Sequence, residues 1–319
     1  MAKISEGLLC GVDVSLDTLD IAQSDGVTRR IANSAQAIKA WLSILPERSA
    51  IALEATGSYH EVLQDQAVER GHQVYLINGK QLHHYREAVG PRAKTDRHDA
   101  GLLLRYLSHE RAHLRPQQPR DEAETRVWRL LKRRATLVRA RAQLQLSLGG
   151  LEETEELSQL VGQQLKDAIR QLERLIHKAA RGLGWTPMLR QCESIPGIGK
   201  LNAVGLVASF HRGHFERVDQ FVAFLGMDVR VRDSGRYRGK RKLTKRGESE
   251  LRRLLYNAAM SFARDPRYKP LYTRLRELGK SSTESYVILA RKLIRIAYCL
   301  LSRGEFFDQA RVKSPCLAT

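Results

Sequence analysis

The stretch "LLCGVDVSLDTLDIAQSDGVTRRIAN", residues 8–33, sets the fold of the first part of the chain. Residues 8–15 predict a mainly apolar strand, residues 18–25 its hairpin partner, and residues 27–33 a third strand. Helical and apolar runs then alternate. They predict helices at residues 34–45, 59–71 and 95–109 and strands at residues 49–55 and 72–78. This order predicts an α/β domain, with a mixed sheet and helices on its faces.

The 319-residue chain is strongly basic, and its charge is unevenly distributed. It holds 54 Lys and Arg against 35 Asp and Glu, a net charge of +19 and a pI near 10.1. Residues 1–115 contain 14 residues of each sign, whereas residues 116–319 contain 40 basic and 21 acidic ones. Such an excess is typical of proteins that bind nucleic acid. The asymmetry predicts that the two parts do different work.

The four cysteines are scattered, without the spacing of a disulfide framework or a zinc site. The first residues lack the apolar core of a secretory signal, and no run approaches about 18 apolar residues. We therefore expect a cytoplasmic protein that is not embedded in a membrane.

Residues 121–181 consist largely of helix formers. Leucines recur every seven residues, at Leu130, Leu137, Leu144 and Leu151. A second apolar series follows an acidic turn, at Val161, Leu165, Ala168, Leu172, Leu175 and Ala179. The two series predict an antiparallel coiled coil. Its first helix carries many arginines, among them Arg129, Arg133 and Arg134, which form either a solvated face or a face for DNA or a guide RNA.

Residues 195–210, "IPGIGKLNAVGLVASF", predict a helix-hairpin-helix in a mainly helical C-terminal part. Gly197 and Gly199 flank an apolar residue after a proline, so that backbone N–H groups of the turn can point at a phosphate. Lys200 follows directly. The pattern indicates sequence-independent contact with a nucleic-acid backbone, although an ordinary helical hairpin would also fit.

Four carboxylates are placed to converge. Asp13 and Glu54 end predicted strands, and Asp96 and Asp99 lie three residues apart on one face of a helix. Asp96 and Asp99 could instead serve as helix-capping residues. If the four do meet, they need positive charge between them, and oxygen-only ligands select Mg²⁺ or Mn²⁺. Such ions catalyse phosphodiester chemistry.

Residues 230–253 hold 11 basic residues against three acidic ones, and glycines at 235, 239 and 247 are expected to keep the segment open to close approach of a backbone. The segment favours phosphate binding over a disordered basic loop. Its candidate binding residues are Arg232, Arg236, Arg238, Lys240, Arg241, Lys242, Lys245 and Arg246. Ser234, surrounded by arginines, is either a turn residue or a nucleophile whose developing charge these cations stabilise.

Together, "GVDVSLDTLDIA", "LEATGSYH", "KTDRHDA", "IPGIG" and "DSGRYRGKRKLTKRGESELRRLLYNAA" resemble the DEDD transposases of the insertion-sequence family that includes the Piv/MooV DNA invertases. The resemblance runs from about residue 8 to residue 300. It implies an RNase H-like (RuvC-like) domain whose acidic tetrad falls on Asp13, Glu54, Asp96 and Asp99, and a C-terminal transposase domain with Ser234 as its catalytic serine.

The resemblance also implies a coiled-coil segment used in assembly. The expected partners are donor and target DNA, a bridge RNA encoded by the element, and further copies of the chain in a dimer or tetramer. The expected domains are residues 1–118 (RNase H-like), 119–183 (coiled coil) and 184–319 (transposase domain).

Three other functions compete with this one. A metal-dependent junction-resolving nuclease would use the same carboxylates without a serine nucleophile. A sugar-kinase or actin-like fold would place Asp13 at ATP-bound Mg²⁺, but the sequence has no second glycine-rich phosphate loop, and +19 suits such an enzyme poorly. A non-catalytic nucleic-acid-binding protein would have no use for four aligned carboxylates.

Overall fold

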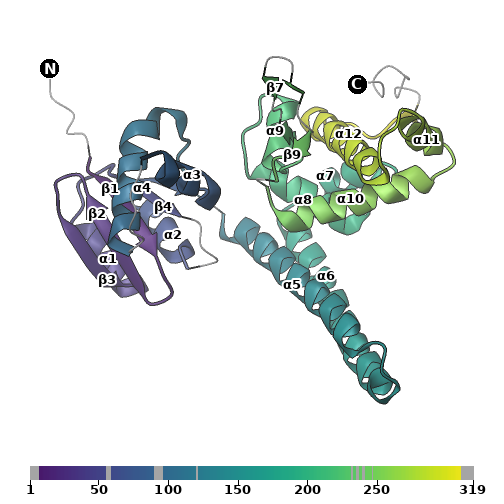
Figure 1. The fold of residues 1–319 in the computed structure, drawn as a ribbon, viewed down its shortest axis with the longest axis horizontal. Helices are drawn as coiled ribbons and strands as arrows, with labels where there is room; N and C mark the ends of the chain where they lie inside the picture. The colour runs from purple at the N-terminus through teal and green to yellow at the C-terminus, as the bar shows by residue number, and fades with distance from the viewer. Residues whose placement is uncertain are drawn as a thin grey trace. The chain divides into compact units, whose positions relative to one another are not determined.

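The computed structural model describes residues 7–54, 59–89, 96–119, 121–230, 233–234, 237–238, 241–245 and 247–309, with the backbone alone at residues 80, 96–98, 233 and 237–238. The chain forms two compact units, Met1–Arg120 and Asp121–Thr319 (Figure 1). Among the described residues, no helix is long and apolar enough to cross a membrane.

The first unit contains one five-stranded mixed sheet, which confirms the predicted α/β organisation. Its strands are β1 (Leu9–Val14), β2 (Thr18–Gln23), β3 (Thr28–Ala32), β4 (Ala50–Glu54) and β5 (Gln73–Ile77), in the order β3-β2-β1-β4-β5. The first three strands form an antiparallel meander, while β1, β4 and β5 run parallel. The parallel strands are joined through helices, because parallel neighbours require a crossover connection.

Helices cover both faces of this sheet. They are α1 (Ala35–Ser43), α2 (Glu61–Glu69), α3 (Gly79–Val89) and α4 (Asp96–Glu110), followed by the 3₁₀ turn η1 (Arg111–His113). Val12 and Leu53 pack with Trp41 of α1 and Leu63 of α2 on one face. On the other face, Ala52 and Tyr75 pack with Leu82 of α3 and with Leu103 and Leu107 of α4. The strand alternation therefore turns Gly11, Asp13 and Glu54 toward the face with α3 and α4.

The second unit begins with two long helices, α5 (Glu122–Leu148) and α6 (Glu155–Gly182), joined through the 3₁₀ turn η2 (Glu152–Thr154). They pack against one another (Figure 1). The predicted leucine seam is found only in part, because Leu130 is half-buried against the core of this unit but the later leucines are not core residues. The buried side chains of α5 are Val127, Trp128, Leu131 and Ala135. Leu144 is exposed, and Leu151 lies beyond the end of α5 with 62% of its surface exposed.

The remaining part is mainly helical, as predicted. Its helices are α7 (Thr186–Glu193), α8 (Lys200–His211), α9 (Val218–Phe224), α10 (Ser249–Arg264), α11 (Lys269–Glu277) and α12 (Ser282–Arg303). The basic segment adds four two-residue strands, β6 (Val229–Arg230), β7 (Asp233–Ser234), β8 (Tyr237–Arg238) and β9 (Lys242–Leu243). Buried residues of α5 and α6, such as Trp128 and Ile176, share one core with these helices. The base of the long helices is therefore part of this unit.

Candidate functional site

Asp13 and Glu54 lie at neighbouring ends of two parallel strands. The register pairs Gly11 with Ala52 and Val12 with Leu53, so Asp13 and Glu54 come next on each strand. Both side chains are half-buried. A Cβ atom added to Gly79 would overlap Oε1 of Glu54, because the carboxylate lies directly against the first residue of α3. This edge of the sheet thus holds two carboxylates on one face.

Helix α4 brings Asp99 to the same face of the sheet. A Cβ atom on Gly11 would overlap the carbonyl of Ala100 and the backbone nitrogen of Leu104, so α4 crosses β1 in direct backbone contact. Asp99 immediately precedes Ala100 and therefore lies beside the strand that carries Asp13. The backbone places Asp96 at the first position of α4, but its side chain is outside the described residues.

Asp99 already has a cationic partner. The guanidinium of Arg86, on α3, donates to Oδ1 of Asp99 at 2.6 Å, and both side chains are largely buried. Among the described side chains, no three His, Cys, Asp or Glu residues are grouped as metal ligands would be. The oxygen-only donor set still has the chemistry that suits Mg²⁺ or Mn²⁺. Arg86 supplies a positive charge next to one of its members.

A further buried carboxylate, Asp20, was missed by the sequence analysis. Asp20 lies directly opposite Asp13 in the β1–β2 pair, and Arg30 lies opposite Asp20 on β3. Asp20 is 4% exposed, and Arg30 donates to both its carboxylate oxygens at 2.8–3.1 Å. The available signal was an aspartate inside a strand with an arginine at the cross-strand position. Asp20 shares the face of Asp13 and Glu54, and its charge is offset by Arg30.

Ser234 lies in a short hairpin of the basic segment. The two-residue strands β7 and β8 pair antiparallel, with Ser234 opposite Tyr237, and the Ser234 side chain is exposed. Of the predicted phosphate ligands here, Arg241, Lys242 and Lys245 are exposed. Arg232, Arg236, Lys240 and Arg246 lie outside the described residues, as does the side chain of Arg238.

Gly247 does allow close approach of a backbone, but the backbone that approaches it belongs to the protein itself. A Cβ atom there would overlap the backbone of Phe224 and Leu225 at the end of α9. A glycine is needed at this position because the backbone at residue 247 lies too close to the end of α9 to leave room for a side chain. Gly235 and Gly239 lie outside the described residues.

The two glycines of the predicted helix-hairpin-helix have different surroundings. Gly197 has a φ of +84°, and an added Cβ atom would lie 2.6 Å from the carbonyl oxygen of Ala258, so the turn packs against the backbone of α10. Gly199 has open space around it and is the N-cap of α8. Lys200 is exposed. The side of the turn that is free for a ligand is therefore the side of Gly199 and Lys200.

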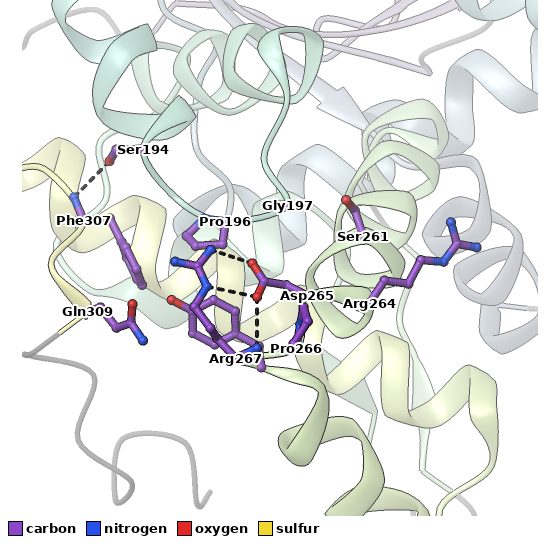
Figure 2. A pocket seen from close by; sticks show the side chains of 11 residues that line it. Ser194, Pro196, Gly197, Ser261, Arg264, Asp265, Pro266, Arg267, Phe307 and Gln309 are labelled. Atoms are coloured by element: carbon purple, nitrogen blue, oxygen red, sulfur yellow. Dashed lines mark hydrogen bonds and ion pairs between the residues drawn. The ribbon is translucent and has the colours of Figure 1, made fainter.

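A cavity of about 790 Å³ lies beside the turn, between Pro196, Gly197 and the loop after α10 (Figure 2). Arg267 donates to both carboxylate oxygens of Asp265, at 3.0 and 2.6 Å, whereas Arg264 points away from this pair in Figure 2. Because Asp265 offsets the charge of Arg267, this ion pair adds no net positive charge to the cavity.

The basic face of α5 is smaller than its sequence indicates. Arg129 and Arg133 are exposed, as a nucleic-acid-binding face requires. Arg134 is only 12% exposed and binds Glu173 of α6 and Glu250 of α10 at 2.8 and 2.9 Å. Arg134 therefore ties three helices together and is not a surface ligand.

Comparison with known proteins places the chain in a family. Residues 189–273 match the family described as "Transposase IS116/IS110/IS902 family", and residues 10–153 match a DEDD transposase family of IS110 type. The "Pilin gene-inverting protein" of Moraxella lacunata is 30% identical over 273 residues, which cover 81% of each chain.

Two other relatives are similar over much of their length. The "Pilin gene-inverting protein" of Moraxella bovis is 28% identical over 94% of this chain and 97% of its own. The "Transposase for insertion sequence element IS1111A" of Coxiella burnetii is 27% identical over 67% of this chain and 68% of its own. The chain therefore belongs to the IS116/IS110/IS902 family of transposases, enzymes that act on DNA.

Proposed function

We propose that this protein is a transposase that cuts and rejoins DNA strands with an acidic, Mg²⁺- or Mn²⁺-dependent site and a nucleophilic serine. The observation that carries the proposal is the placement of Asp13 and Glu54 at adjacent register positions, with α4 laid over the same face. Membership of a transposase family supports the assignment to DNA.

The metal ligands in this proposal are Asp13, Glu54, Asp96 and Asp99, in a domain of RNase H-like fold. A divalent cation held by these carboxylates would activate an attacking oxygen and stabilise a leaving one. Arg86 supports the same assignment, because its contact with Asp99 would offset part of the repulsion between carboxylates that converge on one site.

Ser234 is the nucleophile in this proposal. Its Oγ forms a bond to the scissile phosphorus as the bond from phosphorus to one sugar oxygen breaks, and the proton lost by the serine balances the one gained by the released sugar hydroxyl. Attack by a second sugar hydroxyl then reverses the step and frees the serine, so that strands are rejoined without ATP. The exposure of Ser234 within a basic segment supports this role.

The basic second unit binds the nucleic acids, and we extend the proposal to a guide RNA encoded by the element. The exposed candidate ligands are Arg129, Arg133, Lys200, Arg241, Lys242 and Lys245. Arg232, Arg236, Arg238, Lys240 and Arg246 complete the set from sequence. The long helices α5 and α6 act as a coiled coil in assembly of a dimer or tetramer in the cytoplasm.

The test is a joining reaction. Purified protein, with the RNA that copurifies with it, is incubated with donor and target duplexes and Mg²⁺, and the products are sequenced. Joined donor–target strands are expected. Cleavage without joining would favour the junction-resolving nuclease, and sequencing of the copurified RNA tests the guide.

A further inference from the structure

A second pocket of the second unit is lined neither by Ser234 nor by any of the predicted carboxylate ligands. It has a volume of about 540 Å³ and is formed by α6 and the beginning of α8. Its lining residues are Arg170, Glu173, Arg174, His177, Lys200 and Leu201. Lys200 was predicted to bind nucleic acid, but none of the α6 residues was assigned a role.

The charged groups of this pocket are not all available to a ligand. The carboxylate of Glu173 accepts a hydrogen bond from Arg134 at 2.8 Å, so its negative charge is offset. Arg170 lies 3.3 Å from Asp167 on its own helix. Arg174 and Lys200 are exposed, and within the described part of the chain neither forms an ion pair. Two uncompensated cations from two different helices thus line one concave site.

His177 adds a hydrogen-bonding group rather than a charge. Burial lowers the pKa of His177 below its ordinary value, an effect that nearby Arg181 and Lys200 reinforce and that Glu193 opposes. The imidazole is therefore mainly neutral near pH 7, when it carries one N–H donor. A donor beside two cations suits an oxyanion better than a carboxamide or an apolar group.

We propose that this pocket binds a backbone phosphate of a nucleic acid, with Arg174 and Lys200 as its ligands. The inference rests on the proposed function and names a contact within it. A phosphodiester fits because Lys and Arg on a concave surface are the groups that neutralise nucleic-acid phosphates. The predicted binding surface of the turn then continues from Gly199 and Lys200 onto α6.

The test uses the full chain and fluorescence anisotropy over a series of NaCl concentrations, with a labelled DNA duplex and a labelled RNA stem of arbitrary sequence as separate probes. Arg174→Ala and Lys200→Ala are each expected to weaken binding about three- to tenfold. Each should reduce the slope of log affinity against log salt by about one, because one phosphate contact is lost. Lys178→Ala is the matched control, since Lys178 is exposed on the same helix but does not line the pocket.

The double variant sharpens the test. If Arg174 and Lys200 hold the same phosphate, the fold-loss of affinity in the double variant will be smaller than the product of the fold-losses in the two single variants. Unchanged slopes for Arg174→Ala on both probes, matching Lys178→Ala, would overturn the site while leaving the proposed function intact. Failure of the unaltered protein to bind either probe would overturn both. The probe whose binding is weakened identifies the nucleic acid.

Discussion

The two parts of this protein differ in net charge and in how their charged side chains are arranged. Residues 1–115 carry no net charge, and the buried Asp20 and the half-buried Asp99 each have an arginine partner. Residues 116–319 carry the whole excess of +19, and its exposed cations include Arg129, Lys200 and Lys242. The first unit carries acidic groups on one face of its sheet, whereas the second unit presents exposed positive charge. The contrast is what the proposed function requires, in which catalysis belongs to the first unit and nucleic-acid binding to the second.

The largest expected effect is the loss of one carboxylate from the first unit. Asp13→Asn, Glu54→Gln, Asp96→Asn or Asp99→Asn should each reduce strand joining at least about 100-fold, more than changes outside the ligand shell usually do. Nucleic-acid binding should stay within about twofold. Joining should also stop when a chelator removes Mg²⁺.

Asp17→Asn is the control for this series, because Asp17 is exposed on the turn between β1 and β2. A variant of one of the four carboxylates that joins strands at the rate of Asp17→Asn would remove that residue from the site. For Asp96, full activity with a stability loss of about 1 kcal/mol would identify a helix cap instead.

The next largest effect is expected when the two units are produced as separate fragments and their affinities for DNA are compared. Each has its own core, so fragments 1–120 and 121–319 can be compared with the full chain. We expect the first fragment to bind duplex DNA at least about 100-fold more weakly than the full chain, and the second to retain most of the affinity and its steep salt dependence. Anisotropy titrations measure both. Equal affinity of the two fragments for DNA would contradict the proposal that the second unit binds the nucleic acid.

Within the second unit, the two glycines of the turn should respond differently to alanine. Gly197→Ala combines a left-handed backbone with a clash against Ala258, and should lower the free energy of unfolding by about 3 kcal/mol. Gly199→Ala meets open space and should cost about 0.5–1 kcal/mol, as a poorer N-cap. Thermal or urea unfolding checks the difference. Equal losses would mean that the turn does not pack on α10 as described.

The smallest effect is a stabilisation in the first unit. Gly101 lies inside α4, and an added Cβ atom would meet nothing within 4 Å. Gly101→Ala should raise the free energy of unfolding by about 0.5–1 kcal/mol, because alanine loses less backbone entropy in a helix. Urea unfolding measures the change. A destabilised Gly101→Ala protein would show that this face of α4 is covered.

The sequence predicted the sheet because its signals are local. Alternating apolar residues in residues 8–33 and the helix–strand alternation after them require no knowledge of distant contacts, and they also predicted that Asp13 and Glu54 would be neighbours. The partners Arg86 and Arg134 could not be predicted, since each joins residues from different elements. That Gly197 and Gly247 lie against the protein's own backbone could not be predicted for the same reason. Their role depends on which backbone lies against them.

The leucine repeat of α5 shows a different limit. A seven-residue period predicts that a helix has an apolar stripe, but it does not predict which residues on or beside that stripe are buried. Val127, Trp128 and Leu131 are buried because the base of α5 packs into the core of the second unit as well as against α6. Toward the tip of the paired helices that core is absent, and Leu144 is exposed.

The most direct test of the central claim is a search for a covalent bond between Ser234 and DNA. The protein is incubated with Mg²⁺ and a nicked or mismatched DNA substrate that slows rejoining, then denatured, and the DNA-linked peptide is located by mass spectrometry. The account predicts an adduct on Ser234 in the unaltered protein and none in Ser234→Ala, which still binds its nucleic acids. Cleavage without any adduct, or an adduct that persists in Ser234→Ala, would contradict it.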